Sequence, residues 1–201
     1  MVDTSYIKNG NVADNARLFK EMAVYLFNEN EAVGTLSDTW TPPSGKQPFG
    51  YLSEDGLEIN REDGDNNEFK GHNGDNVLVS KSGGYLTIKA TGLEAKREVV
   101  EAYFNADIED NHVYVDPDKQ EKRRQLLVVG LDQLNRLIFM HAPSVTVNEI
   151  ESFNLKNGEL SSFGMTFRTY SHTGVGGRKY HADFFNIFVD NTPTVTPHHD
   201  N

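Results

Sequence analysis

Residues 49 to 64 read Phe49-Gly-Tyr-Leu-Ser-Glu-Asp-Gly-Leu-Glu-Ile-Asn-Arg-Glu-Asp-Gly64, and this stretch decides the fold class. In its second half the apolar Leu57 and Ile59 alternate with the polar Glu58 and Asn60. Because successive side chains of a β-strand point to opposite faces, the alternation predicts a strand from Phe49 to Asn60 with one buried and one polar face. We therefore expect a protein built from sheets that bury one of their faces.

Further predicted strands are rich in β-branched and aromatic residues and are bounded by polar or turn-forming residues. They are Ala23–Phe27, Val77–Lys81, Tyr85–Ala90, Gln125–Leu131, Asn135–His141, Val145–Leu155, Glu159–Tyr170 and Arg178–Phe185. The glycines of Ser82-Gly83-Gly84 predict a tight hairpin between the strands on either side. Later reversals are predicted at Asp132-Gln133, Pro143-Ser144 and Asn157-Gly158.

One helix is predicted between Leu93 and Phe104, because Val99, Val100, Tyr103 and Phe104 form a single apolar stripe at helical spacing. Such a stripe needs a sheet to cover. The expected fold is mainly β, with two packed antiparallel sheets as a sandwich or open barrel and one flanking α-helix. The side chains expected between the sheets are Leu57, Ile59, Leu86, Ile88, Phe163, Met165 and Phe167.

The chain has 201 residues, which is enough for one domain with its own core. We expect that domain at 23–190, preceded by an N-terminal arm at 1–22 and followed by a polar C-terminal tail at 191–201. A long loop is expected at 61–76, where Phe69 is the only apolar residue among three glycines, five acidic residues and four asparagines. A second polar insert runs from residue 107 to residue 124.

The composition excludes several classes of protein. There is no cysteine, which rules out disulfides and thiolate metal sites. The 19 basic and 30 acidic residues give a net charge of -11, which opposes non-specific binding to DNA or to anionic lipid. Residues 1 to 20 hold no apolar stretch typical of a signal peptide, and no run reaches membrane-spanning length.

The residue patterns predict no enzyme. The glycine-rich run from His172 to Arg178 lacks the Gly-Lys-Ser/Thr ending of a phosphate loop and is better explained as a hairpin turn. His198, His199 and Asp200 lie in a polar tail without neighbours to orient a metal ion. Adjacent acids such as Glu54 and Asp55 would point to opposite faces of a strand. We expect no catalytic residues, no metal site and no cofactor.

The segment from Phe49 to Gly64 resembles the second-strand region of the major tail proteins, or tail tube proteins, of siphovirus-type, actinobacteriophage-like tailed phages. The most specific element is Tyr51-Leu-Ser-Glu-Asp-Gly56. The order around it is similar too, with a Val-Tyr-rich first strand at 23–27, a Trp- and Pro-containing loop at 40–48, a helix at 96–104 and a late strand at 161–170. The long N-terminal arm and the charged insert at 107–124 depart from the family pattern.

This resemblance implies a tail-tube-like fold that assembles as hexameric rings, stacked into a tube that conducts phage DNA to the host. It implies self-association and contacts with other tail proteins such as the tape measure and the tail terminator, with DNA passing through without specific binding and with no membrane partner. The expected location is the virion tail, assembled in the cytoplasm of the host bacterium.

Two groups of residues are candidates for this role. An acidic tube wall would not bind the phosphates of passing DNA, and the lumen-facing candidates are Glu58, Glu62, Glu149 and Glu151. Contacts between subunits or rings are expected from the polar loop and the N-terminal arm. Those candidates are Arg61, Asp63, Asp65, Glu68, Phe69, Lys70, Leu18 and Phe19.

A second hypothesis from another class is a carbohydrate-binding β-sandwich, on a virion surface or secreted. In that protein Trp40 and Tyr51 would form an aromatic platform for a sugar. The size in solution discriminates the two, because a binding module stays small whereas a tube subunit forms rings or polymers.

Overall fold

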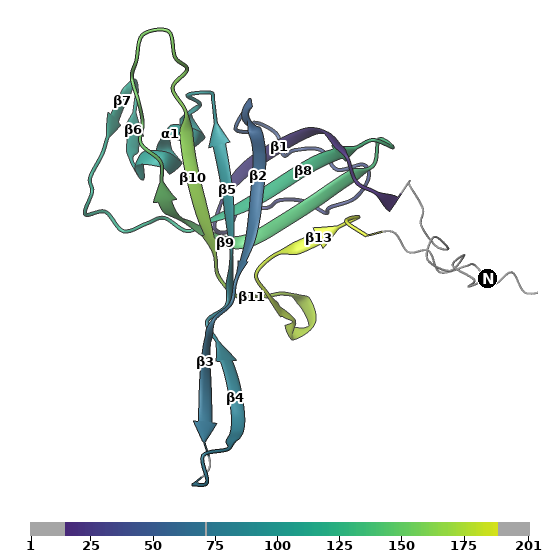
Figure 1. Cartoon of the computed structure of the whole chain (residues 1–201). Coiled ribbons are helices and arrows are strands. Elements are labelled where there is room, and N and C mark those ends of the chain that lie inside the picture. Colours follow the sequence, from purple (N-terminus) through teal and green to yellow (C-terminus); the bar gives the residue numbers. More distant parts are fainter. Residues whose placement is uncertain (1–14, 71, 189–201) are drawn as a thin grey trace, which may run out of the picture.

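The computed structural model describes residues 15–70 and 72–188. Strands dominate this part of the chain, with one short α-helix near its middle (Figure 1). The elements are β1 Phe19–Asn28, β2 Leu52–Glu62, β3 Asp65–Lys70, β4 Asn76–Ser82, β5 Tyr85–Gly92, α1 Arg97–Phe104, β6 Asp107–Glu109, β7 His112–Tyr114, β8 Arg124–Asp132, β9 Leu137–Ile150, β10 Phe163–Thr169, β11 His172–Thr173, the 3-10 helix Val175–Gly177, β12 Lys179–Tyr180 and β13 Asp183–Phe185.

One antiparallel sheet carries the fold, in the order β1-β8-β9-β10-β5-β2, and β13 adds to it beside β9. The sheet curls, so that the Phe49 amide, just before β2, donates a hydrogen bond to the Val24 carbonyl of β1 at 2.8 Å. The two ends of the strand order therefore approach each other on one side. The mainly β class and the single helix are confirmed, and the sheet takes the open-barrel form rather than two separate sheets.

The curl depends on β9, which is long enough to serve both halves of the sheet. Its residues 137–145 pair with β8 and its residues 145–150 pair with β10. The predicted reversal at Pro143-Ser144 is wrong, because the strand continues through both residues. The register with β8 shifts at this point, from Leu126 opposite Ala142 to Arg124 opposite Val145. This bulge accommodates Pro143 within the strand, although Pro143 has no amide hydrogen to donate to a neighbouring strand.

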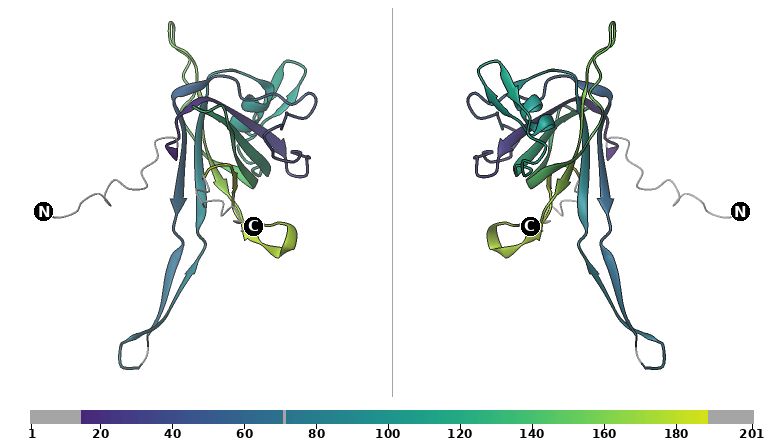
Figure 2. Two further views of the ribbon diagram at one scale, coloured as in Figure 1. Left: turned by 90° about the vertical axis from the view of Figure 1, so that its right-hand side faces the viewer. Right: turned by 90° about the vertical axis from the view of Figure 1, so that its left-hand side faces the viewer.

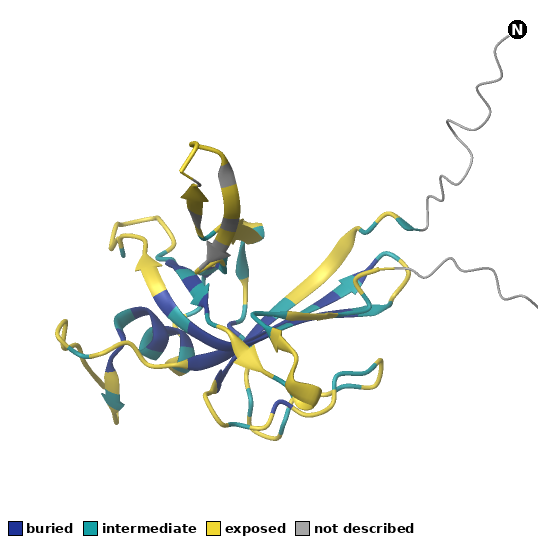
Figure 3. Cartoon of the chain, turned by 90° about the horizontal axis from the view of Figure 1, so that it is seen from below, coloured by how far each residue is buried: buried dark blue, intermediate teal, exposed yellow. Residues whose placement is uncertain are grey.

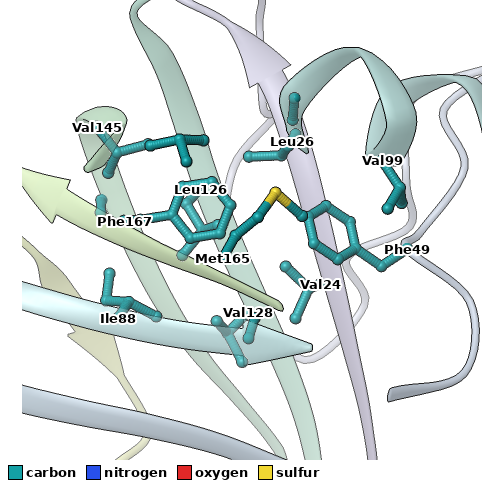
Figure 4. Packing of buried hydrophobic residues seen from close by; sticks show 14 of the residues in the cluster. Val24, Leu26, Phe49, Ile88, Val99, Leu126, Val128, Val145, Met165 and Phe167 are labelled. Carbon is teal, nitrogen blue, oxygen red and sulfur yellow. The ribbon is translucent and has the colours of Figure 1, made fainter. Parts of the chain in front are cut away.

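The main core lies inside the curl and is closed by α1 (Figure 4). Val99, Ala102 and Tyr103 of the helix are buried, and Val100 and Phe104 pack against the same cluster. The helix begins at Arg97, later than expected, and ends at Phe104; the capping residue Asn105 has a left-handed φ of 47°. The core side chains are Val24, Leu26, Phe49, Ile88, Ala90, Leu126, Val128, Met140, Ala142, Val145, Val147, Phe163, Met165 and Phe167.

The predicted buried set is confirmed in part. Ile88, Phe163, Met165 and Phe167 are buried, whereas Leu57 and Leu86 are half-buried. Ile59 is 41% exposed, so its predicted burial is wrong. Ile59 lies opposite Ile88 of β5. Because β2 is the outermost strand of the sheet, Ile59 has a neighbouring strand on one side only, and its other side stays exposed.

A second, smaller core lies on the other face of β1, β8 and β9, under the loop that joins β1 to β2. Tyr25, Phe27, Val33, Leu127 and Phe139 are buried there. Trp40 closes this cluster from the loop, with edge-on ring contacts to Tyr25 at 5.6 Å and to Phe139 at 5.7 Å. Its indole Nε1 donates to the Val33 carbonyl at 3.0 Å, which satisfies the one polar atom of the ring.

The predicted long loop at 61–76 is wrong. The strand β2 continues to Glu62, and the chain then forms a two-stranded hairpin, β3–β4, which we call the arm. It projects from the body of the subunit (Figures 1 and 2). The arm is polar because it covers no core, and its backbone groups pair strand to strand instead. The predicted hairpin at Ser82-Gly83-Gly84 is also wrong, since β4 pairs with β3 while β5 pairs with β2 and β10.

A corner between β8 and β9 ties down both ends of the described chain. Asp132 is fully buried, and its carboxylate accepts hydrogen bonds from the Leu134 and Arg136 amides and from the Arg136 and Arg17 guanidiniums at 2.7 to 2.9 Å. Arg17 also donates to the Asn186 carbonyl beyond β13. Because Arg17 is anchored and β1 begins at Phe19, residues 17 to 22 belong to the domain and not to the N-terminal segment that was expected at 1–22.

We expect Asp132→Asn to lower the melting temperature at neutral pH. Burial by itself would raise the pKa of Asp132, but the hydrogen bonds from Arg136 and Leu134 lower it to about 2. A lowered pKa contributes stability that is complete above the unfolded value of about 3.9 and is lost as the pH falls toward the folded value. The deficit of the variant should therefore shrink as melting is measured from about pH 7 to about pH 3. A deficit that stays constant over this range would refute the assignment.

Candidate functional site

The outer face of β2, β5, β10 and the end of β9 is polar and open to solvent. One row of cross-strand neighbours runs over it, from Glu58 through Lys89 and Thr166 to Glu149. Glu58 and Glu149 are exposed, and the apolar residues that alternate with Lys89 and Thr166 are buried in the core. The predicted alternation thus places two of the four acidic candidates in one row of the sheet.

Glu151 joins this face by pairing with Lys89. Its Oε1 lies 2.7 Å from the Lys89 Nζ, and its amide donates to the Gly164 carbonyl at 2.9 Å. A Cβ at Gly164 would lie 2.4 Å from the Glu151 carboxylate, so this glycine leaves room for Glu151 in its present conformation. The hydrogen bond that the Lys89 ammonium donates to Glu151 raises the pKa of Lys89, and Glu58 and Asp55 add to the effect through their charges. One ammonium thus faces three carboxylates.

These groups line a hollow of about 550 Å³ on the polar face. Asp55, Glu58 and Glu151 contribute the acids, and Lys89 contributes the cation. Glu149 is in the same row of the register but borders a different hollow, beside α1. Glu62 lies two residues beyond Asn60 on β2, at the base of the arm and opposite Tyr85. The structure therefore brings Glu58 and Glu151 together and places Glu149 and Glu62 on the same sheet but outside this hollow.

A second cation on this part of the sheet is held against aromatic rings. The Arg168 guanidinium lies over the Tyr85 ring, 4.0 Å from its centre, and 5.9 Å from the centre of the Tyr170 ring. Stacking of this kind fixes the plane of a guanidinium. Arg168 was not among the sequence candidates, because nothing in its local pattern shows that the register brings Tyr85 beside it.

The arm carries half of the predicted contact residues, and two more lie at its base. Asp65, Glu68, Phe69 and Lys70 lie on β3 and are exposed (Figure 3). At the base of the arm, Arg61 forms an exposed ion pair with Asp63 at 3.2 Å. Leu18 and Phe19 lie elsewhere, at the start of β1, where Leu18 is 67% exposed and the Phe19 ring lies against Gly130. The candidates therefore form two separate surfaces.

An apolar patch on the arm was missed from the sequence. Phe69 and Leu78 are cross-strand partners, and Phe69, Val77 and Leu78 are all exposed by more than half. The prediction placed Val77 in a strand of the main sheet, where it would have been covered. The signal that could have indicated the arm is the run of polar residues around this trio, since a core strand would not be so polar.

The glycine-rich run has the hairpin form that was predicted. His172 pairs with Tyr180 and Thr173 with Lys179, with a 3-10 turn between them. Within residues 15–70 and 72–188 no group of three or more acidic or histidine side chains is placed to hold a metal ion. The described helix is too short and too polar to cross a membrane. His198, His199 and Asp200 lie outside the described residues.

The sequence matches the family of phage tail tube proteins over residues 22–181, and the chain belongs to this family. The protein is thus a structural component of a phage tail tube, as the resemblance in residues 49 to 64 implied. The fold is similar to a subunit in the extended sheath-tube complex of the extracellular contractile injection system PVC, with 13% identity over 91% of this chain and 99% of that chain and a TM-score of 0.43. It is also similar to the tube-terminating cap of the anti-feeding prophage, with 12% identity over 92% and 99% of the chains and a TM-score of 0.45. No curated protein matches the sequence.

Proposed function

We propose that this chain is the major subunit of the tail tube, that it forms hexameric rings, and that the rings stack into a tube through which phage DNA passes. The single observation that supports DNA conduction is the acidic outer face of β2, β5, β10 and β9. In a member of a tail tube family, such a face is suited to form the wall of the lumen. Six copies of this face around an axis would present rings of carboxylates to the lumen.

The sign of the charge fits the passage of a polyanion. Lysine and arginine contacts to phosphates release counterions and bind DNA strongly, so a basic wall would hold the polymer. On the proposed wall the Lys89 ammonium is paired with Glu151, and the Arg168 guanidinium is stacked on aromatic rings. Around Glu58 the wall therefore offers the DNA phosphates no strong binding site, and DNA slides past without specific recognition.

The arm is the proposed contact between rings. It makes no contribution to either core, so its exposed Phe69, Val77 and Leu78 are available for another subunit. The arm candidates Arg61, Asp63, Asp65, Glu68 and Lys70 would form the polar rim of that contact, and Leu18 and Phe19 would serve a second contact. The tube would meet the tape measure inside and the terminator at its end, and it would be assembled in the cytoplasm of the host.

The aromatic platform on which the carbohydrate-binding hypothesis depended is not formed. Trp40 is packed into the second core and its Nε1 is already hydrogen-bonded to the Val33 carbonyl, so the ring is not free to stack on a sugar. Tyr51 is 78% exposed, but among the described residues no second ring lies beside it to complete a platform. No observation on the described residues favours this alternative.

The proposed function is tested by concentrating the purified chain and following its size by sedimentation and negative-stain electron microscopy. We expect rings with six subunits, and stacks of these rings as the concentration rises. A protein that sediments as a monomer at every concentration, and that is absent from tail tubes isolated from the virion, would contradict the proposal.

A further inference from the structure

The hairpin at 171–181 is a cationic projection on an acidic protein. No acidic residue lies between Tyr170 and Ala182, whereas the whole chain has a net charge of -11. Arg178 and Lys179 are exposed, and neither has an ion-pair partner among the described residues. Val175, at the tip, is fully exposed. The hairpin thus presents an apolar tip flanked by two unpaired cations.

The hairpin is held in one shape without help from a partner. The Gly174 amide donates to the Arg178 carbonyl at 2.9 Å, and the Gly177 amide donates to the Gly174 carbonyl at 3.1 Å. The His172 and Tyr180 rings meet edge to face, 5.5 Å apart. At its base the His181 Nδ1 lies 3.1 Å from the hydroxyl of the buried Thr169. A projection fixed in this way loses little freedom on binding.

The complementary surface lies around β6 and β7. Residues 107 to 121 hold six acidic residues and one lysine, Lys119, which is paired with Asp107. Beside this segment is a hollow of about 320 Å³. Its apolar lining includes Phe104, Val115 and Ile150, and Asp116, Glu121 and Glu149 border it. Val115 and Ile150 are both more than half exposed, so the hollow has an uncovered apolar floor within an acidic rim.

The two surfaces lie at opposite ends of the subunit along the direction of the arm. The hairpin at 171–181 is on the side toward the arm, and β6 and β7 are on the far side, in the views of both Figure 1 and Figure 2. One copy cannot bring them together, whereas two copies in the same orientation, one above the other, can. A contact between two different surfaces of identical subunits propagates without limit, as a stack of rings requires.

We propose that the hairpin at 171–181 docks into the acidic hollow beside β7 of a subunit in the adjacent ring. Val175 enters the hollow, and Arg178 and Lys179 face Asp116 on its rim and Asp118 two residues further along the chain. The occupant is a second copy of this chain, because copies of net charge -11 repel each other and the two unpaired cations of this hairpin offset that repulsion at the contact. The proposal rests on the proposed function and adds a second axial contact to that of the arm.

The test uses two charge-reversed proteins and their mixture. One is Arg178→Glu with Lys179→Glu, and the other is Asp116→Lys with Asp118→Lys. Glu121 is left unchanged because its charge interacts with that of the buried Arg124. Each variant alone should form rings but raise the concentration needed for tubes by roughly tenfold or more, since like charges would then face each other. An equimolar mixture should form tubes again, because each hairpin then finds a hollow of opposite charge.

A third variant, Val175→Asp, checks the apolar part of the contact. Val175 packs against nothing within the subunit, so the variant should melt like the wild type while tube formation is lost. If the reversed variants form tubes at the wild-type concentration, or if the mixture does not restore tubes, the inference is wrong while the proposed function stands. Loss of the rings themselves would overturn the axial placement. A wild-type protein that forms neither rings nor tubes would instead refute the proposed function.

Discussion

Deletion of residues 65–82, which removes the arm, is expected to abolish tube formation and leave the subunit folded. The strands β3 and β4 pair only with each other, and neither contributes to the buried clusters. The deletion joins Gly64 to Gly83, and Glu62 and Tyr85, which flank the new connection, are already cross-strand partners. A four-residue hairpin loop of Asp63-Gly64-Gly83-Gly84 can close that pair. The melting temperature should therefore change by only about a few degrees.

Two controls separate the length of the arm from its chemistry. A glycine and serine segment of the same length tests reach without side chains. The triple change Phe69→Ser, Val77→Ser and Leu78→Ser keeps the strands and removes the exposed apolar patch. Both proteins should fail to form tubes in electron micrographs if the patch makes the contact. Normal tubes from the deleted protein would show that the arm has no part in stacking.

Reversal of two acids to lysine, at Glu58 and Glu151, is expected to make the tube bind DNA; Glu149 is left unchanged because it borders the hollow beside β7. Glu151 is the partner of Lys89, so the variant frees that ammonium and adds two more beside it. Multiple lysines in each ring, repeated along the tube, create phosphate contacts whose affinities add along the DNA. Labelled double-stranded DNA should associate with the variant tubes at low salt and not with wild-type tubes, and phage that carry the variant should release DNA slowly.

The stability of this variant should change little. The ion pair that it breaks is exposed and contributes little to stability, and the other exposed substitution shifts stability by about 0.5 kcal/mol or less. The matched variant with glutamine at the same positions removes the acids without adding cations and should not bind DNA. Binding by the lysine variant should disappear as salt rises. Lysine tubes that neither bind DNA at low salt nor slow its release would mean that these residues do not face the lumen or that the sign of its charge is irrelevant.

The patterns that depend on local sequence were predicted well. Alternation gave the inward Ile88, Phe163, Met165 and Phe167, helical spacing gave the stripe on α1, and glycine content gave the hairpin after His172. In each of these the residues that decide the structure are neighbours in the sequence. The polar row through Glu58 and Lys89 follows from the same alternation, although its continuation to Glu149 depends on the order of the strands.

The predictions that failed depend on contacts between distant segments. The polar residues at 61–76 predicted a loop because a strand was assumed to need a core, yet a two-stranded ribbon can satisfy its backbone without one. Pro143 predicted a turn, but a bulge opposite Arg124 and Leu126 accommodates it within a long strand. Trp40 was considered as a sugar platform because nothing near it in the sequence shows that Tyr25 and Phe139 surround it.

The pairing of the first long strand with a much later one has a consequence for synthesis on the ribosome. β1 pairs with β8, and Arg17 reaches Asp132 across 115 residues of chain. Such non-local pairing gives the fold a high contact order, which slows folding, and β1 has no partner until most of the chain has been translated. The hairpin at 171–181 is translated later still. A nascent chain therefore lacks this proposed contact until every strand from β1 to β10 has been translated. An incomplete subunit would then lack one of the contacts that it needs to join a growing polymer.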